Sequence, residues 1–305
     1  MEEYNMDAIV SPDCAAESCQ GGQPASGRNQ RVPYAGAMAK ATAPPTLALP
    51  AGLYSRPELS LSLKAVSKDF YPSMGQSVYI GRTLLITNLR KHFGVLHGRM
   101  LDFGCGSKPY KSLIRVDEYI GVDYEGQGHS HENEQIDVFY DGKTIPVASD
   151  HFDSVLSTEV FEHVFNPEEI LDELHRVMKP GAVMLATCPF IIAEHEVPND
   201  CSRYTSYGLK MLLERKGFEI LYYEKLGTSV QAQMQMFMSY LDSYVLSKLN
   251  FARPIKKVVS FCTFLMLNLL CKLMNRILPK RYDAFLNHIV ICRKRDRPEY
   301  KAAGV

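Results

Sequence analysis

Short apolar runs alternate with helical patterns through the middle of this chain, and this alternation limits its fold more than any other feature. The runs predict strands at residues 100–103, 118–122, 135–139, 152–157, 182–187 and 219–225, with a last strand at 287–292. Strands separated by helices are typical of βαβ units, whose strands lie parallel within one sheet. We therefore expect an α/β fold with a seven-stranded, mostly parallel sheet and flanking helices.

The expected helices have recognisable ends. The helix at residues 166–178 begins with Asn166, a capping residue type, and Pro167, which suits the first turn. Lys-Pro-Gly at residues 179–181 then ends it, and Gly217 ends a second helix at residues 206–216 in the same way. A third helix, at residues 77–93, has an apolar face and should pack beside the first strand.

Composition divides the chain into four parts. Residues 1–58 are rich in Ala, Pro, Ser and Gly and lack apolar periodicity, so we expect a disordered leader. Residues 59–228 are the predicted α/β core. Residues 229–284 are a predicted helical insertion, and residues 285–305 hold the last strand and a tail.

Charge and cysteine content exclude several classes of protein. The 34 basic residues are balanced by 34 acidic residues, so we expect no nucleic-acid partner. The eight cysteines form no CxxC pair and show no Cys/His spacing, so we expect neither a metal nor a disulfide framework. The first residues are acidic and no apolar segment follows them, which favours a cytoplasmic protein.

The end of the first predicted strand carries a glycine loop, Leu101-Asp-Phe-Gly-Cys-Gly106. Asp102, Gly104, Cys105 and Gly106 stand where the ligand crevice of an open α/β sheet lies, and glycine lets a ligand approach the backbone closely. A dinucleotide-binding loop would carry a third glycine, GxGxxG, where this chain has Pro109. The missing glycine weighs against NAD, although it does not exclude it.

Further motifs follow this loop in order, and together they resemble one known family. They are residues 119–123 (Tyr-Ile-Gly-Val-Asp), residues 141–146 (Asp-Gly-Lys-Thr-Ile-Pro), and the fourth predicted strand with its exit, residues 152–163. Over about residues 75–225 and the last strand, the chain resembles the type-11 methyltransferase-domain family of Rossmann-like class I S-adenosylmethionine-dependent enzymes. Within that family it resembles a bacterial subgroup with Gly-Cys-Gly-x-x-Pro-Tyr and His-Glu-x-Pro-x-Asp-x-x-Arg-Tyr-Thr segments.

The resemblance implies S-adenosyl-L-methionine as cofactor and gives several residues a role. Asp123 ends the second strand, where a carboxylate can accept hydrogen bonds from ribose hydroxyls. The resemblance places Asp141 at the adenine amino group and the Gly142 amide at a ring nitrogen. It places Asp102 and the glycine loop at the methionine end, with Ser157 and Thr158 near the methionine amine. Cys105, between two glycines, is expected to pack rather than to react. Lys108 departs from the wider class, which often has a third glycine there.

A polar loop after the fifth predicted strand, residues 195–205, is the predicted acceptor site. His195 is the predicted general base, because an imidazole with its usual pKa of about 6.5 can take a proton at neutral pH. Asp200 would orient His195 or act alone, and Arg203 would hold an anionic group of the acceptor. Asp200 and Arg203 could instead form an ion pair that staples the loop. Glu162 and His163 are given no catalytic role.

The helical insertion is apolar from Val258 to Leu270 and has basic residues on both sides. This run is shorter than the roughly 20 residues that cross a bilayer. Two interpretations remain for residues 254–281: a lid or dimer surface, which we prefer, or an element that rests on the inner face of a membrane. The oligomeric state stays open.

The predicted function is methyl transfer from S-adenosyl-L-methionine to a hydroxyl, amine or carboxylate. The acceptor would be a small molecule or a saccharide-type or lipid-linked molecule. One alternative is a Rossmann oxidoreductase that uses NAD. Another is a non-catalytic adenosylmethionine-binding scaffold.

Overall fold

The computed structural model describes residues 70–126, 134–249 and 252–296. Contacts within the chain separate residues 1–39 from residues 40–305, and all described residues belong to the second unit. The predicted leader, residues 1–58, therefore lies outside the described residues.

A seven-stranded sheet forms the centre of the described unit, with strand order β3-β2-β1-β4-β5-β7-β6. All neighbouring strands run parallel except β7, which is antiparallel to both β5 and β6. The predicted fold class is confirmed. The strands are β1 (Arg99–Phe103), β2 (Glu118–Tyr124), β3 (Val138–Tyr140), β4 (Phe152–Thr158), β5 (Met178–Pro189), β6 (Phe218–Leu226) and β7 (Asn287–Lys294).

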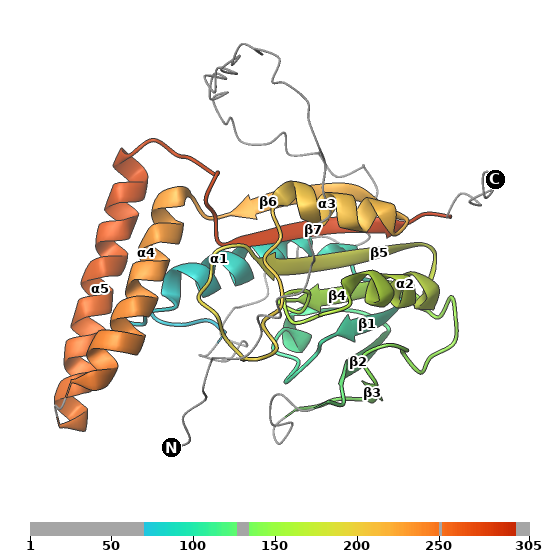
Figure 1. Ribbon diagram of the computed structural model, residues 1–305, viewed down its shortest axis with the longest axis horizontal. Coiled ribbons are helices and arrows are strands. Elements are labelled where there is room, and N and C mark those ends of the chain that lie inside the picture. The colour runs from blue at the N-terminus through green and yellow to red at the C-terminus, as the bar shows by residue number, and fades with distance from the viewer. Residues whose placement is uncertain (1–69, 127–133, 250–251, 297–305) are drawn as a thin grey trace, which may run out of the picture. The chain divides into compact units, whose positions relative to one another are not determined.

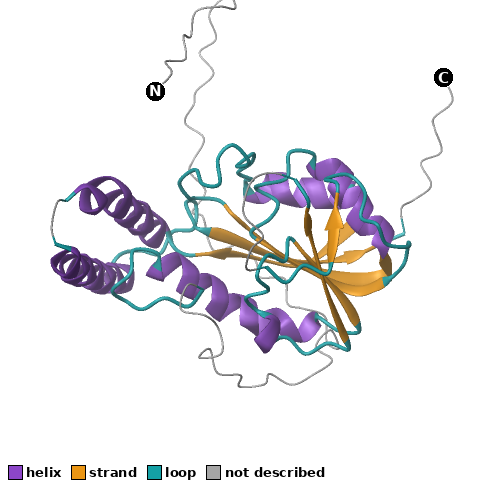
Figure 2. Cartoon of the chain, turned by 90° about the horizontal axis from the view of Figure 1, so that it is seen from below, coloured by secondary structure: helices purple, strands orange, loops and turns teal. Residues whose placement is uncertain are grey.

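Helices cover both faces of the sheet, as Figure 2 shows. The α-helices are α1 (Tyr79–Leu89), α2 (Pro167–Val177), α3 (Ser206–Arg215), α4 (Ser229–Tyr240) and α5 (Arg253–Ile277). Short 3-10 turns follow at Arg90–Val95, Lys111–Leu113 and Leu246–Lys248, and a π-helical turn occupies Leu241–Val245. In the chain, α4 and α5 lie between β6 and β7, where the insertion was predicted.

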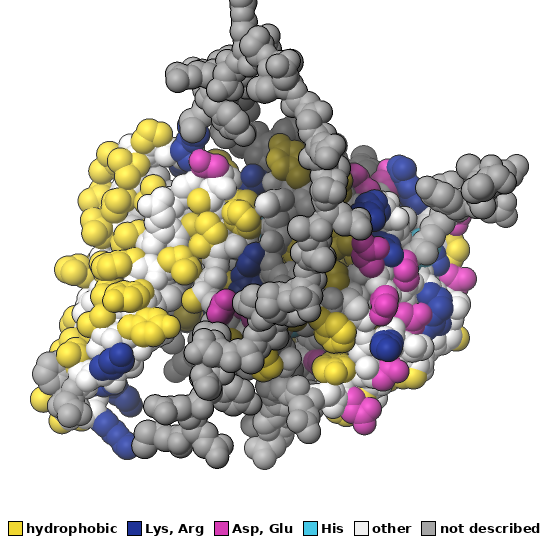
Figure 3. Space-filling model, in the orientation of Figure 1, with side chains coloured by type: hydrophobic (Ala, Val, Ile, Leu, Met, Phe, Trp, Pro, Cys, Tyr) yellow, Lys and Arg dark blue, Asp and Glu magenta, His cyan; other side chains and the backbone are white. Residues whose placement is uncertain are grey.

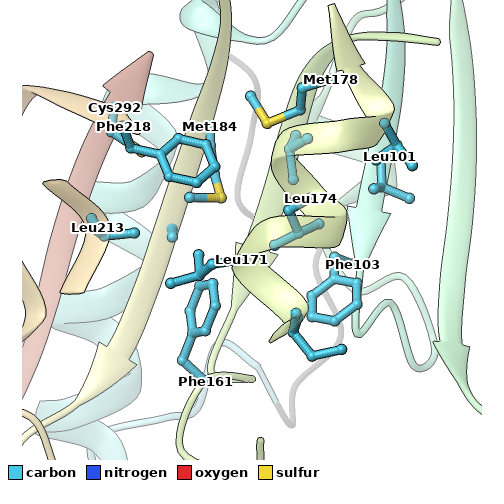
Figure 4. Close-up of a cluster of buried hydrophobic side chains, with 14 of the residues drawn as sticks. Leu101, Phe103, Phe161, Leu171, Leu174, Met178, Met184, Leu213, Phe218 and Cys292 are labelled. Carbon is cyan, nitrogen blue, oxygen red and sulfur yellow. The ribbon is translucent and has the colours of Figure 1, made fainter. Parts of the chain in front are cut away.

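The largest part of the core lies between α2, α3 and the sheet (Figure 4). Leu171 and Leu174 of α2 are fully buried against Leu101 and Phe103 of β1 and other strand residues. Apolar residues three and four apart form this face, because that spacing puts side chains on one side of a helix. The apolar face of α2 therefore packs directly on the sheet.

Two local predictions need correction. Asn166 was expected to cap α2, but its side chain accepts no hydrogen bond from the helix; its Nδ2 donates to the Gly142 carbonyl at 3.1 Å and to Glu169 Oε2 at 2.7 Å. The helix predicted at residues 77–93 is α1 followed by a 3-10 turn, and α1 contacts β6, β7 and α4 rather than standing beside β1 alone. It shares a buried cluster with Met100 of β1.

The helices α4 and α5 lie side by side beyond the end of the sheet where the parallel strands finish (Figure 1). Ala232 and Met238 of α4 pack with Phe264 and Leu267 of α5 and with Ile80 of α1. The helix α5 has 25 residues, a length of about 37 Å at about 1.5 Å per residue. Its most apolar window has mean hydropathy 1.6, and by length and composition it could cross a membrane. The expectation that this segment is too short was therefore wrong, because the helix continues beyond the apolar run at both ends.

Candidate active site

A cavity of about 690 Å³ lies at the carboxyl ends of the parallel strands. Its walls come from the segments after β1, β2, β4 and β5, and from α1 and α4. Two groups of residues mark its ends. We call Gly104, Gly106, Asp123 and Gly142 the glycine end, and Glu162, His163 and His195 the histidine end.

The glycine end begins where β1 turns away from the sheet. Gly104 and Gly106 have φ angles of +71° and +44°, in the left-handed region that glycine adopts without strain. A Cβ on Gly104 would stand 2.3 Å from Val160 Cγ2. The backbone therefore needs glycine at this position, and the absence of side chains leaves the turn open to the cavity.

Lys108 stands where the wider class often has a third glycine, and its backbone adopts the conformation that a glycine would take. Its φ is +52°, so a lysine takes the left-handed conformation of the glycine usual in the wider class. Its side chain runs under Gly121, and its ammonium group pairs with Asp137. The turn therefore closes without the third glycine.

Asp123 organises the loop at its end of β2. Its Oδ2 accepts a hydrogen bond from the Gly106 amide at 2.7 Å, and its Oδ1 accepts one from the Tyr124 amide at 2.8 Å. The carboxylate is buried and lines the cavity. A charge-assisted acceptor is thus held beside the glycine turn, where it can also receive hydroxyl donors.

Asp102 and Cys105 are the buried side chains of the glycine loop. Asp102 is buried and is not among the cavity-lining residues; it accepts a hydrogen bond from the Tyr119 hydroxyl. Burial raises the pKa of the Asp102 carboxyl to about 7, and the Tyr119 hydrogen bond opposes this shift. Cys105 lines the cavity, but burial raises the pKa of its thiol, so it is a poor nucleophile at neutral pH.

Asp141 and Gly142 have different positions. Asp141 is exposed and outside the cavity lining, and its Oδ1 accepts the Lys143 and Thr144 amides at 2.8 and 2.7 Å. These two hydrogen bonds, the one from Thr144 first, lower the pKa of the Asp141 carboxyl. Gly142 lines the cavity with φ +84°. Asp141 thus shapes the turn that presents Gly142.

Two tyrosines that sequence analysis missed also line the glycine end. Tyr124 follows Asp123 directly, Tyr140 precedes Asp141, and their ring centroids are 5.9 Å apart. Aromatic rings beside a buried carboxylate suit a flat heterocycle attached to a sugar. Their positions next to the two motif aspartates were the available signal.

The exit of β4 contributes one predicted lining residue and one that was missed. Thr158 lines the cavity, whereas Ser157 is fully buried outside it, and its hydroxyl has no hydrogen-bond partner among the described residues. Glu159 lines the cavity with φ +56°, and it accepts hydrogen bonds from Thr187 at 2.7 Å and Asn287 at 2.5 Å. Burial raises the pKa of Glu159 to about 7. Such a strained backbone is common where a fold presents functional groups.

The histidine end unites the β4 exit with the loop after β5. The His163 and His195 rings lie 4.9 Å apart, nearly perpendicular. Glu162 is only 1% exposed, and both of its carboxyl oxygens lack hydrogen-bond partners among the described residues. Burial raises the pKa of Glu162 well above its ordinary value, and the neighbouring Glu159 carboxylate adds to the shift. Glu162 and His163, which were given no role, thus join the predicted His195.

Asp200 and Arg203 stand behind His195. Arg203 Nη2 donates to Asp200 Oδ2 at 2.6 Å, and neither side chain lines the cavity. Asp200 Oδ2 accepts the His195 amide at 3.1 Å and lies 3.4 Å from His195 Nδ1. The pair with Arg203 lowers the pKa of Asp200. This arrangement matches the alternative in which the two residues staple the loop, with Asp200 also orienting His195.

Comparison with known proteins now bears on this site. Residues 81–223 match a family model described as a methyltransferase domain. A search of the curated proteins finds no matching sequence. Three similar solved structures can be compared with this chain. The 4+2 cyclase SpnF is 19% identical over 74% of this chain and 86% of that one, with a TM-score of 0.44. A SAM-dependent methyltransferase from Archaeoglobus fulgidus is 19% identical over 74% and 97%, with a TM-score of 0.40. Haemonchus contortus phosphoethanolamine N-methyltransferase 2, in complex with S-adenosyl-L-methionine, is 13% identical over 79% and 62%, with a TM-score of 0.41.

The matched residues run from α1 through β6 and include the whole glycine end. The match supports a methyltransferase, the class that the sequence motifs predicted, and with it S-adenosyl-L-methionine as the cofactor. The match favours this class over the alternative of an NAD-type oxidoreductase. The residues present fit this cofactor: the turn at Gly104 has no room for a side chain, Asp123 offers a buried carboxylate, and Tyr124 and Tyr140 offer aromatic faces.

Proposed function

We propose that this enzyme methylates a hydroxyl group of a lipid-linked acceptor, and that it works at the cytoplasmic face of a membrane. The observation that carries the proposal is the position of α4. Gln235, Met236 and Ser239 of α4 line the cavity. Phe237 and Tyr240 of the same helix are exposed, 47% and 56%, and α4 also contacts α5. A lipid-linked molecule could thus pass from these exposed residues into the cavity along one helix.

The chemistry of the histidine end favours a neutral acceptor. The carboxyl groups of Glu159, Glu162 and Glu196 line the cavity there, and whether protonated or charged they offer an acceptor carboxylate no positive partner. A hydroxyl must lose a proton as it attacks, and an imidazole is a suitable acceptor for it. These residues therefore support a hydroxyl over a carboxylate.

S-adenosyl-L-methionine supplies a sulfonium methyl group with a good leaving group. The new bond joins that methyl carbon to the acceptor oxygen while the carbon–sulfur bond breaks, and S-adenosylhomocysteine leaves. His195 takes the hydroxyl proton at Nε2, because its Nδ1 faces the Ala193 carbonyl at 3.2 Å and Asp200 at 3.4 Å. Catalysis is then mainly the positioning of two bound groups for in-line attack.

The outer surface of α5 is the proposed membrane contact. Hydrophobic side chains gather over α4 and α5, whereas charges of both signs cover the opposite part of the molecule (Figure 3). Residues 253–281 contain seven lysines and arginines and no acidic residue. This charge favours a surface of anionic lipids over a neutral one. The exposed apolar residues of α5 are Ile255, Val258, Phe261, Met266, Leu269, Leu270, Leu273 and Ile277.

The inner face of α5 argues for a helix that rests on the membrane rather than one that crosses it. Phe264, Leu267 and Cys271 are buried against the rest of the unit. Asn268 Nδ2 donates to the Met74 and Gln76 carbonyls at 2.8 and 3.2 Å. A spanning helix would exchange these contacts for lipid and leave Asn268 unpaired in hydrocarbon.

Vesicle co-sedimentation tests the membrane contact. We expect binding to vesicles that contain phosphatidylglycerol and much weaker binding to pure phosphatidylcholine. The double variant Leu269→Ser with Leu273→Ser should lose binding, because both residues are about half exposed on α5. The matched control is Tyr207→Ser with Met211→Ser, also exposed and four residues apart, on α3. Equal binding by both double variants would overturn the proposal, as would a dimer that only the α5 variant disrupts without any change in vesicle binding.

The acceptor is tested separately. Enzyme and cofactor with a labelled methyl group are incubated with a membrane lipid extract and, in parallel, with water-soluble metabolites. The proposal expects the label in the organic phase, in an ether that survives mild alkali. Label confined to a water-soluble product, or in an alkali-labile ester, would refute it.

A finer family position is also proposed. The segments Gly104 to Tyr110 and His195 to Thr205 support the type-11 bacterial subgroup that the sequence resembles. Finding both segments in close homologues with the same substrate would test this.

A further inference from the structure

Three potential metal ligands meet at the histidine end. One atom each from Glu162, His163 and His195 lies within 4.8 Å of the others. All three residues line the cavity. The cysteine pattern predicted no metal, whereas these ligands are a glutamate and two histidines from two segments distant in the sequence.

The first indication that these three residues bind a cation is the environment of the Glu162 carboxyl group. It is 1% exposed, and neither oxygen has a hydrogen-bond partner among the described residues. Burying a carboxyl group without partners is costly, so such groups are normally paired or bound to a metal. A cation at this point would supply the missing partner.

The orientation of both imidazoles is the second sign. His163 Nδ1 lies 3.1 Å from the Asn199 carbonyl, and His195 Nδ1 lies 3.2 Å from the Ala193 carbonyl. A carbonyl only accepts, so in each ring Nδ1 carries the proton and Nε2 keeps its lone pair. Metal-binding histidines are typically held in this way from behind.

The two rings and Glu162 also converge in space. His163 Nε2 lies 3.7 Å from Glu162 Oε1 and 3.7 Å from Glu196 Oε2. Asp200, 3.4 Å from His195 Nδ1, completes a carboxylate–histidine pair behind the second ring. The lone pair of His163 Nε2 therefore lies beside a Glu162 oxygen, His195 contributes a third ligand atom within 4.8 Å, and Glu196 is a nearby fourth oxygen.

We propose that Glu162, His163 and His195 bind one divalent transition-metal ion of the zinc type. Two imidazoles and one carboxylate suit Zn²⁺ or Co²⁺ rather than Mg²⁺, which prefers oxygen ligands. Three protein ligands leave a coordination position open to the cavity.

The consequence for the reaction rests on the proposed function. An acceptor hydroxyl bound at the open position would release its proton to water more readily, because the cation stabilises the alkoxide. His195 would then act through the ion instead of as the base. Treatment with a chelator separates these roles: metal-free enzyme should lose activity in the first case and keep it in the second.

Binding is tested without reference to activity, on the full chain freed of any purification tag. Titration of metal-free protein with Zn²⁺ should show one tight site, and Co²⁺ should give visible absorption bands of a low-symmetry site. Glu162→Gln and His195→Ala should each weaken binding by at least about a hundredfold, since loss of outer partners alone reduces affinity by about 10–100-fold. Mg²⁺ should compete poorly.

The control is His151→Ala, a histidine at the other end of β4. It should bind Zn²⁺ as the unchanged protein does. Thermal unfolding of each variant shows whether it folds, and Glu162→Gln should fold well because it nearly keeps the size and shape of the buried side chain. The inference is overturned if the unchanged protein binds no Zn²⁺ at one equivalent, or if Glu162→Gln and His151→Ala bind it equally. Failure here leaves the methyl-transfer proposal intact, since that is measured with labelled cofactor.

Discussion

At the glycine end of the cavity the backbone makes the site, whereas at the histidine end side chains make it. Gly104 and Gly106 owe their places to left-handed turns, and Asp123 is fixed by two backbone amides. Glu162, His163 and His195 come from two separate loops and depend on each other's positions. A cofactor that all members of a family use can be bound by backbone groups that stay the same. An acceptor used by one enzyme has to be recognised by side chains that differ between members.

The strongest test of this contrast is Gly104→Ala. At φ +71° an alanine costs about 1–2 kcal/mol, and the added Cβ would stand 2.3 Å from Val160. That overlap should add about 1–3 kcal/mol of destabilisation and displace the loop from the cofactor. We expect a total loss of about 2–5 kcal/mol in denaturant unfolding and no S-adenosylhomocysteine binding by calorimetry.

Gly181→Ala is the matched control, because Gly181 has φ +77° but nothing within 4 Å of its Cβ position. It should show the conformational cost alone and bind S-adenosylhomocysteine normally. If both variants lost the same stability and still bound S-adenosylhomocysteine, the glycine at position 104 would have no role in cofactor binding.

The second prediction concerns pH and the buried Asp102. Its pKa is raised from 3.8 to about 7 by burial, so the folded state holds a proton that the unfolded state releases. Stability should therefore fall as pH rises from about 4 to about 7, by at most about 4 kcal/mol at about 1.4 kcal/mol per pKa unit.

Asp102→Asn should remove this dependence, which urea unfolding at a series of pH values will show. Tyr119→Phe removes the hydrogen bond that opposes the shift, so its fall in stability should continue to higher pH. Parallel curves for Asp102→Asn and the unchanged protein would assign the pH dependence to other groups.

The third prediction compares the two motif aspartates. Asp123→Asn should weaken S-adenosylhomocysteine binding by roughly 10- to 150-fold, the equivalent of a charge-assisted hydrogen bond worth about 1.5–3 kcal/mol. Asp141→Asn should change it by less than about threefold, because Asp141 is exposed and caps its own turn through backbone amides. An equal loss in calorimetric titrations would restore the adenine contact that the family resemblance implies for Asp141.

Some features of the fold and of the site could be predicted from the sequence, and others could not. The strand segments, the glycine loop and Asp123 follow from local patterns, because a strand that ends in Gly-x-Gly turns sharply at its carboxyl end. The β4 exit was found as a segment, but the burial of Glu162 depends on the loop that covers it. Its role could not be read from neighbours in the chain.

The insertion shows the opposite limitation. Its helices were predicted, yet the apolar run from Val258 to Leu270 understated α5, whose charged ends continue the same helix to 25 residues. Which face is exposed depends on α1 and α4, since Ile80 and Met238 cover only the inner side. Packing partners distant in sequence decide that, and periodicity alone does not reveal them.

The smallest expected effect belongs to Lys108→Gly, which restores the commoner glycine. Removing a side chain at φ +52° should stabilise the turn by about 1 kcal/mol. Against this, the variant loses the pair with Asp137 and leaves a gap below Gly121, where Lys108 Cε now fills the space. Asp137 is half-exposed and still accepts the Gly121 amide at 2.7 Å, so the unpaired carboxylate is tolerable. The opposing terms should leave stability within about 1 kcal/mol of the unchanged protein and S-adenosylhomocysteine affinity within about threefold. A large loss of affinity in calorimetry would mean that the lysine, and not the glycines alone, holds the loop in its binding conformation.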